Sequence, residues 1–196
     1  MSTESHAEHV RQVFGGELAE IGDQALREQV LRTWVRAMAL SGASDLRQDL
    51  RFLKDVDKPG LGVEHIRAVV RLALAIAGAL AEAHGAALDR DVVAAGALLH
   101  DVGKLLEHAP AERHVLAGNL VRHAFSGTYL AIEEGLPREV LHIIAYHSLE
   151  GQRLRRTPEG EVVYRADFLS LDALARRELD KSGFDYLPYV YLPPHV

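Results

Sequence analysis

A histidine–aspartate pair at the end of an apolar helical run is the feature that most constrains this chain. In the run from Gly96 to Lys104, GALLHDVGK, His100 and Asp101 follow small and aliphatic side chains and precede a glycine and a lysine. Burying two ionisable residues is costly unless another group pairs with them. A metal ion is the commonest partner of a histidine and a carboxylate together. The pair therefore predicts a polar centre inside a hydrophobic core.

Composition limits the class of protein. The chain has 196 residues, of which 48% are hydrophobic, enough for one well-buried domain. It has no cysteine, which excludes disulfides, thiolate zinc sites and cysteine nucleophiles and fits a cytoplasmic location. A net charge of −6 gives no support for a nucleic-acid surface. The N-terminus lacks the layout of a signal peptide, and Arg67, Arg71 and Glu82 interrupt the most apolar region, so we expect no membrane span.

Almost every segment has a helical pattern. Asp23 is placed to cap a helix that ends near Gly42, Gly85 is a stop signal, and Asp89 or Asp91 caps the helix leading to the His-Asp pair. The predicted helices cover 23–42, 63–84, 89–100, 117–134, 137–147 and 161–181, with loops at 44–62 and 151–160. No alternating strand pattern of useful length appears. The predicted fold class is all-α, a helical bundle with a metal site in its core.

The chain divides into three parts. Residues 1–60 are predicted to be a helical segment and loop that pack on the core, although the helix around Trp34 could instead form a homodimer contact. Residues 61–181 form the main domain. Residues 182–196 form an aromatic, proline-rich tail that we expect to pack in an extended form along the surface or against a partner. His6 and His9 are interpreted as solvated tail residues.

Five polar residues share helix faces with the predicted core. Residues three, four and seven apart lie on one face of a helix, and each of these side chains aligns with aliphatic or small neighbours at that spacing. They are His65, His100, His123, His147 and Asp167. One isolated buried histidine is usually a core residue bonded to a carbonyl. Five on five helices are better explained by convergence on a metal, and Asp101 adds a sixth group that could lie between two ions.

The remaining histidines are weaker candidates. His142 is interpreted as a structural or surface residue, and His84 as a helix-end residue. His108 and His114 lie in the loop after the His-Asp pair, where either could line the mouth of a pocket or be solvated.

Cationic residues could bind a phosphate. Arg153, Arg155 and Arg156 form a basic cluster after His147, and arginine binds phosphate oxygens in a bidentate manner. A solvated loop balanced by nearby glutamates is an equal alternative. Arg67 and Arg122 flank predicted ligands and are further candidates, while Glu64 and Glu107 could orient imidazoles.

The chain resembles the HD-domain metal-dependent phosphohydrolases. The resemblance rests on His65, on the His100-Asp101 pair within ALLHDVGK, and on Asp167 within ADFLS, and it covers about residues 61–181. RHAFSGTYLA and IIAYHSLEG resemble the two additional histidine segments of the dinuclear branch, which implies that His123 and His147 complete a second metal position. The chain departs from that pattern at Tyr146, since many relatives carry paired histidines there. By resemblance, Lys104 faces the phosphate; the alternative is a surface lysine at a helix end.

Three functions follow as hypotheses. The first is hydrolysis of a phosphomonoester or phosphodiester, on a nucleotide-like small molecule, by water activated by a divalent metal, with Asp101 orienting the water. Two ions are expected, drawn from iron, manganese, magnesium, cobalt, nickel and zinc. The second is a di-iron oxygenase on the same scaffold. The third, a non-catalytic interaction module, is disfavoured because all six ligands are present.

Overall fold

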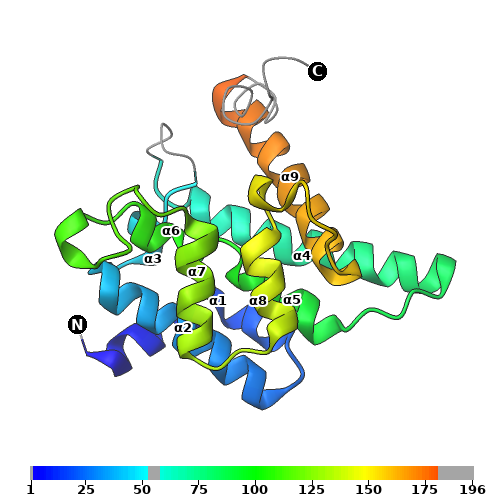
Figure 1. Ribbon diagram of the computed structural model, residues 1–196, viewed down its shortest axis with the longest axis horizontal. Helices are drawn as coiled ribbons and strands as arrows, with labels where there is room; N and C mark the ends of the chain where they lie inside the picture. The colour runs from blue at the N-terminus through cyan, green and yellow to red at the C-terminus, as the bar shows by residue number, and fades with distance from the viewer. Residues whose placement is uncertain (1, 53–57, 181–196) are drawn as a thin grey trace.

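The computed structural model describes residues 2–52 and 58–180, and within them every regular element is helical (Figure 1). The predicted all-α class is confirmed. The helices are α1 Thr3–Ala19, α2 Gln24–Ser41, α3 Leu46–Asp49, α4 Leu61–His84, α5 Arg90–Leu99, α6 Lys104–Glu107, α7 His123–Glu133, α8 Arg138–Tyr146 and α9 Pro158–Leu179, with short 3-10 turns at Ala111–Arg113 and Leu149–Gly151. The predicted tail, 182–196, lies outside the described residues.

Helix α5 is the centre of the bundle. It packs against α4, α8, α9 and α2, and its eight residues from Val92 to Leu99 are all buried. The helix is rich in alanine and contains Gly96, and such small side chains let neighbouring helices approach closely. A Cβ on Gly96 would lie 2.5 Å from Ile143 Cδ1 of α8. The C-terminal end of this crowded helix is therefore held from several sides, and it is the end that carries His100.

Helices α1 and α2 belong to the same hydrophobic core as the rest of the bundle. Phe14 and Trp34 are fully buried with ring centroids 5.1 Å apart, in one cluster with residues of α4, α5 and α8. The interpretation of His6 and His9 as solvated was wrong, because both lie on α1, a helix that the sequence did not predict. His6 is only 5% exposed, and His9 Nε2 accepts the Leu46 N–H at 3.0 Å.

Most predicted helix ends are confirmed by their caps. The Asp23 side chain accepts the Leu26 N–H at 3.0 Å, and the Asp89 side chain accepts those of Asp91 and Val92. Gly42 and Gly85 end their helices in the left-handed conformation, with φ of 80° and 64°.

Three helix starts and one loop differ from the prediction. The helix expected from 63 begins at Leu61, and the segment 44–62, predicted to be loop, contains the short helix α3, whose first turn is capped by the Asp45 side chain. The helix expected from 117 begins at His123, because Gly118 and Asn119 have φ of 90° and 63°. The helix expected from 161 begins at Pro158, since the Thr157 hydroxyl caps the Gly160 N–H.

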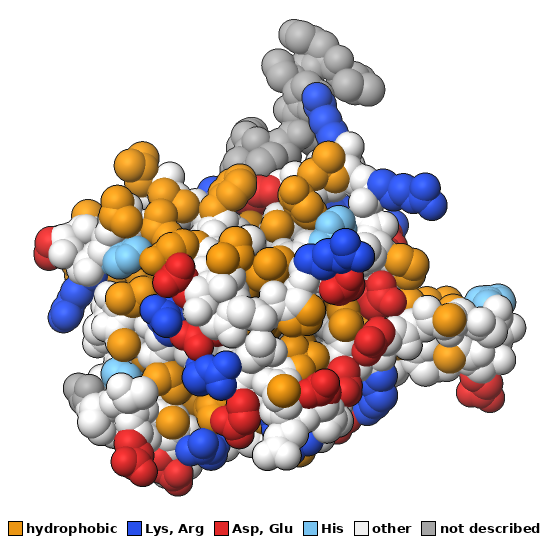
Figure 2. Space-filling view, turned by 60° about the horizontal axis from the view of Figure 1, so that its bottom comes forward, with side chains coloured by type: hydrophobic (Ala, Val, Ile, Leu, Met, Phe, Trp, Pro, Cys, Tyr) orange, Lys and Arg blue, Asp and Glu red, His pale blue; other side chains and the backbone are white. Residues whose placement is uncertain are grey.

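The surface carries several large hydrophobic side chains. Figure 2 shows hydrophobic side chains gathered toward one edge of the face in view, with acidic and basic side chains distributed over the remainder. The exposed ones include Phe125, Tyr129 and Ile132 along one side of α7. No described helix combines the length and apolar character that crossing a membrane requires.

Candidate metal centre

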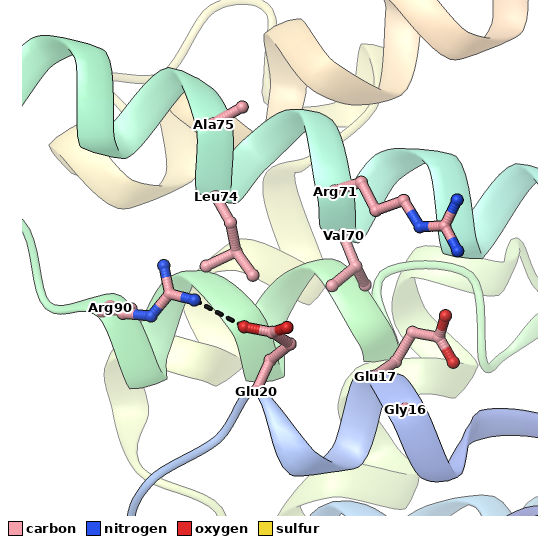
Figure 3. Close-up of a pocket in the computed structure, with 8 residues that line it drawn as sticks. All are labelled: Gly16, Glu17, Glu20, Val70, Arg71, Leu74, Ala75 and Arg90. Carbon is pink, nitrogen blue, oxygen red and sulfur yellow. Dashed lines mark hydrogen bonds and ion pairs between the residues drawn. The ribbon is translucent and has the colours of Figure 1, made fainter.

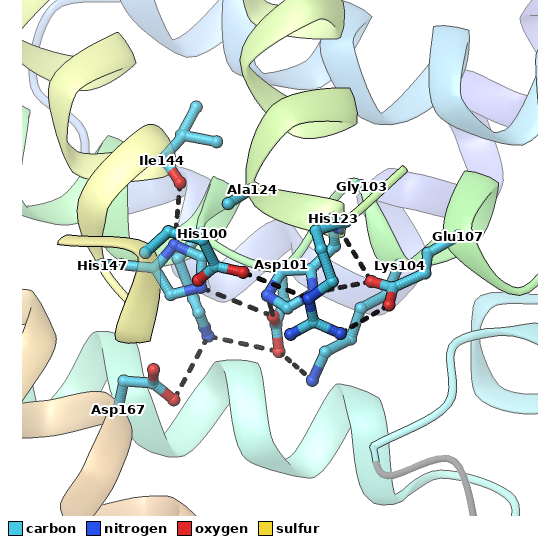
Figure 4. A network of polar contacts seen from close by, with 12 residues as sticks. His100, Asp101, Gly103, Lys104, Glu107, His123, Ala124, Ile144, His147 and Asp167 are labelled. Carbon is cyan, nitrogen blue, oxygen red and sulfur yellow. Dashed lines mark hydrogen bonds and ion pairs between the residues drawn. The ribbon is translucent and has the colours of Figure 1, made fainter. Parts of the chain in front are cut away.

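The six predicted ligands come from the ends and inner faces of five helices. His65 lies on α4 and Asp167 on α9, while His123 is the first residue of α7. His100 and His147 follow the last residues of α5 and α8, and Asp101 lies in the turn before α6. The structure brings all six together, each at most 8% exposed. Figure 4 shows several of them pointing toward one another between the helices.

The first of two groups consists of His65, His100 and Asp167. His65 Nε2 lies 3.1 Å from Asp167 Oδ1 and 3.3 Å from His100 Nε2, and His100 Nε2 lies 3.8 Å from Asp167 Oδ1. The three donor atoms fall within 4.8 Å of one another, as they must to share one ion. We call this the first ligand group.

The second ligand group consists of Asp101, His123 and His147. Asp101 Oδ1 lies 3.4 Å from His123 Nε2 and 3.8 Å from His147 Nε2. The other carboxylate oxygen, Oδ2, lies 3.6 Å from His65 Nε2 and 3.4 Å from His100 Nε2, both in the first group. One oxygen of Asp101 thus faces each group, which is the arrangement of a bridging carboxylate.

Hydrogen bonds at Nδ1 orient all four imidazoles. His100 Nδ1 lies 2.7 Å from the Ala97 carbonyl, and His147 Nδ1 lies 2.9 Å from the Ile144 carbonyl. A carbonyl cannot donate, so both Nδ1 atoms carry a hydrogen, and Nε2 is the nitrogen of each ring that can bind a metal. His65 Nδ1 is bonded to the Ser170 hydroxyl at 2.9 Å and His123 Nδ1 to the Glu107 carboxylate at 2.7 Å. Fixing the ring through its second nitrogen is what metal-ligating histidines require.

The donor set fits a divalent cation. Four imidazole nitrogens and two carboxylates, without sulfur, suit iron, manganese, cobalt, nickel or zinc, and the carboxylates suit magnesium. The Nε2 atoms of His65 and His100 are 3.3 Å apart, and two lone pairs at that distance repel unless a proton or a cation lies between them. A hydrogen or a cation therefore lies between these two Nε2 atoms, and a divalent cation bound by both would take that place.

Lys104 supplies one positive charge at the edge of the centre. Its Nζ lies 2.7 Å from Asp101 Oδ2 and donates to the Phe52 carbonyl at 2.9 Å. Burial would raise the pKa of Asp101, but the charges of Lys104 and His100 outweigh burial and hold that pKa well below its usual range. Burial, followed by the charge of His100, lowers the pKa of His147 to about 4. At neutral pH Asp101 is thus an anion and His147 a neutral ligand.

A carboxylate–arginine–carboxylate chain supports the second ligand group. Glu107 Oε2 accepts both the Nδ1–H and the backbone N–H of His123, at 2.7 and 2.8 Å. Arg122 donates to Glu107 at 2.7 Å and to Glu150 at 3.1 Å. Although burial opposes it, bonding to His123 lowers the pKa of Glu107 to about 2. Glu150 Oε2 is buried and has no hydrogen-bond partner among the described residues, so it is an acceptor directed into the interior.

Replacing Glu107 with glutamine is expected to weaken metal binding about 10- to 100-fold, because outer carboxylates orient ligating histidines and raise their basicity. The substituted side chain would be neutral, and one of its two terminal atoms would be an amide nitrogen, which cannot accept a hydrogen bond. Metal affinity is measured by competition with a chromophoric chelator. Glu112→Gln is the matched control, since Glu112 is exposed on a 3-10 turn. Equal affinities for the two variants would show that Glu107 does not support the ligand.

The arginine cluster after His147 is only partly as predicted. Arg153 and Arg155 are exposed, but the Arg156 guanidinium donates to the carbonyls of Tyr146 and Ser148, at 2.7 and 2.8 Å. It also lies 3.8 Å from the centre of the Tyr164 ring. The structure therefore places Arg156 where it fixes the chain on both sides of His147, rather than where the sequence interpretation expected a phosphate contact.

Other charged candidates have different partners from those predicted. Glu64 does not orient an imidazole; it forms a two-bond ion pair with Arg177, at 2.6 and 2.9 Å. Arg67 donates to the Val13 carbonyl and lies 3.6 Å from Glu17. The His142 ring accepts the Thr157 N–H at 3.2 Å, in agreement with a structural interpretation.

Sequence reasoning did not assign a role to Ser170 or Phe52. Ser170 lies three residues after Asp167 on the same face of α9, so helical spacing was a usable signal for it. The Phe52 ring centroid lies 4.9 Å from that of His65, and its carbonyl binds Lys104. Phe52 lies outside the helices, where periodicity carries no information.

The larger open cavities among the described residues lie elsewhere. One, of about 440 Å³, is bounded by α1, α4 and the start of α5, and Figure 3 shows its charged residues. Glu20 and Arg90 form an ion pair across it at 2.5 Å, and Glu17 faces Arg67. Its charges are largely balanced by one another, and it contains none of the six ligands.

Comparison with known proteins agrees with this geometry. The model of the HD domain family matches residues 62–172, more than half of the chain, and the matched segment contains all six predicted ligands. No curated protein and no solved structure matches the chain. The family implies divalent metal binding, and the two ligand groups provide the donors for it. The chain belongs to the HD domain family, and with it to the superfamily of HD-domain metal-dependent phosphohydrolases.

Proposed function

We propose that this chain is a metal-dependent phosphohydrolase that cleaves a phosphomonoester or phosphodiester bond of a nucleotide-like small molecule. The observation that carries the proposal is the position of Asp101, with one carboxylate oxygen toward each ligand group. A carboxylate that bridges two cations is the arrangement used for in-line displacement at phosphorus. The family match supports hydrolase chemistry and does not favour the oxygenase alternative.

The six residues His65, His100, Asp101, His123, His147 and Asp167 are proposed to hold two divalent cations. Such cations, when bound, lower the pKa of water and stabilise charge on phosphoryl oxygens. The residues themselves contribute fixed geometry, since every imidazole is oriented through Nδ1. Asp101 is proposed to orient the attacking water as well as to bridge.

Lys104 is proposed to hold the phosphoryl group of the substrate. Its side chain is 13% exposed and its Nζ lies 2.7 Å from Asp101, at the edge of the centre rather than within it. An ammonium there would stabilise the negative charge that develops on the phosphoryl oxygens. Arg153 and Arg155 remain proposed contacts for the rest of the substrate, whereas Arg156 is proposed to act by positioning His147.

The division of the chain is also a proposal. Residues 61–181 would form the HD domain, with 1–60 packed on it and 182–196 as a tail. A homodimer is a further proposal. The helix around Trp34, the contact considered from the sequence, is buried in the core, so the proposal now rests on the exposed hydrophobic residues, since large apolar surface is often used for association.

The assignment is tested by assaying metal-free protein reloaded with manganese, magnesium, iron(II), cobalt, nickel or zinc. We expect phosphate or alcohol release from nucleotides or p-nitrophenyl esters with at least one metal, and loss of that release with a chelator. Hydrolysis should persist without oxygen, whereas an oxygenase would stop. If every ester stays intact with every metal, the proposed function is wrong.

A further inference from the structure

A small basic cavity lies beside the metal centre, between the end of α2, the segment after α3, and α6. Its volume is about 250 Å³, and its lining includes Gly42, Asp49, Arg51, Leu105, His108 and Arg113. We propose that this cavity binds a phosphoryl group. None of its residues is a metal ligand, so the site is distinct from the centre described above.

The two arginines of the cavity, Arg51 and Arg113, line the same small space and form no ion pair with any described residue. The lining also contains one acidic residue, Asp49, whose Oδ2 accepts the N–H groups of Ser44 and Asp45 at 2.8 and 3.0 Å. The two guanidinium charges therefore exceed the one carboxylate charge of the lining. Two guanidinium groups at one cavity attract an anion that offers several oxygens, and phosphate fits their planar donors.

The Arg113 guanidinium lies against the backbone of Gly42. Gly42 has φ of 80°, and a Cβ built on it would lie 2.7 Å from Arg113 Cζ and 2.9 Å from Nη1. The absence of a side chain at this position, which ends α2, leaves room for the guanidinium beside the cavity.

His108 is a third polar residue of the lining, but not a donor to the anion. Its Nδ1 lies 3.3 Å from Asn119 Oδ1 and donates there, and burial lowers the pKa of the ring, so its Nε2 is a lone pair that can accept only from a protonated phosphate oxygen. His108 follows Lys104 by four residues, one helical turn, which separates them by about 6 Å along the axis of α6. The two side chains thus lie on the same side of this short helix.

Lys104 and Phe52 separate the cavity from the metal centre. Arg51 directly precedes Phe52, whose carbonyl binds Lys104 Nζ at 2.9 Å and whose ring lies 4.9 Å from that of His65. His108, about 6 Å from Lys104 along α6, lines the cavity, so a molecule with its reacting phosphoryl group at Lys104 would have the cavity within about one helical turn for a second one. The substrate class that fits is a nucleotide-like molecule with two phosphoryl groups. This assignment of a substrate class rests on the proposed function, whereas the proposal that the cavity binds an anion does not.

The binding claim is tested by titrating pyrophosphate into the full chain after metal removal, by calorimetry. We expect binding by the unmodified protein and a loss of about tenfold or more in the Arg51→Ala, Arg113→Ala double variant, since charge-assisted bonds to both groups are removed. The control is Arg11→Ala, Arg138→Ala, which removes the same number of charges from exposed positions that are given no role in substrate binding. Circular dichroism verifies that each variant is folded.

Equal affinities of the two double variants, or no binding by the unmodified protein, would overturn the anion site. A second measurement, made on metal-loaded enzyme, tests whether the anion bound by the cavity is part of the substrate. If the substrate supplies it, the Arg51, Arg113 double variant raises KM about tenfold for a nucleoside diphosphate and leaves KM for the monophosphate unchanged. If the double variant loses pyrophosphate binding but keeps the KM for both the diphosphate and the monophosphate, the substrate assignment is wrong. The cavity would then bind an anion other than the substrate. If no ester is cleaved at all, the proposed function fails, and the pyrophosphate titration still decides the cavity.

Discussion

Replacing Asp101 with asparagine should abolish metal-dependent activity, with a loss of about 10³-fold or more. Among the described residues, Asp101 is the one whose two side-chain oxygens face both ligand groups, so its loss affects both positions together. The magnitude follows because metal-based charge stabilisation amounts to several kcal/mol, and each ~1.4 kcal/mol corresponds to a tenfold change in rate. The measurements are the initial rate on the best ester found and the metal content per chain.

Asp167→Asn is the comparison that isolates the bridge. Asp167 Oδ1 lies near His65 and His100, in the first ligand group. Metal content should therefore fall at one position in this variant and at both in Asp101→Asn. If the two variants retain the same amount of metal, Asp101 is not a bridge and the two groups do not form one dinuclear centre.

Replacing Gly103 with alanine should lower the free energy of unfolding by about 3 kcal/mol, at the upper end for overpacking a core. A Cβ there would collide with the His123 carbonyl oxygen and lie 2.6 Å from the Gly127 backbone nitrogen. Both obstacles are backbone atoms of α7, so a rotamer change cannot relieve them. For a chain of this length the melting temperature should fall by roughly 10 °C.

Replacing Gly78 with alanine is expected to have the opposite effect, an increase in the free energy of unfolding. Gly78 lies within α4, is exposed, and has no atom within 4 Å of a built Cβ. Alanine there should raise stability by about 0.5–1 kcal/mol, because it reduces the backbone entropy lost on folding. Chemical denaturation of both variants measures the difference. A Gly103→Ala protein as stable as the unmodified one would mean that α6 and α7 are not packed as described.

Helix ends with a local chemical signal could be predicted from the sequence. Asp23 and Asp89 cap their helices through their own side chains, and Gly85 ends α4 in the left-handed conformation. The segment 117–122 was predicted to be helical because its apolar spacing continued that of α7. There the left-handed backbone at Gly118 and Asn119 overrides periodicity, and Leu120 is 90% exposed.

The sequence was sufficient to predict that the ligands converge. It was not sufficient to predict which other residues contact them and hold them in position. Helical spacing predicts that His65 and Asp167 face the core, because that depends on neighbours along one helix. The contact between Lys104 and Phe52, and the bonds from Arg156 to the chain around His147, join segments by tertiary packing. A pattern within one helix holds no information about such contacts, which is why Arg156 was expected to face a phosphate.

The scattering of the six ligands also bears on the order in which the protein matures. His65 and Asp167 are 102 positions apart in the chain (167 − 65), yet their donor atoms lie 3.1 Å apart. A partly collapsed chain offers cations only single, weakly binding side chains, since closing so long a loop has an entropic cost that local structure does not repay. We therefore expect cation uptake to follow the docking of distant parts of the polypeptide.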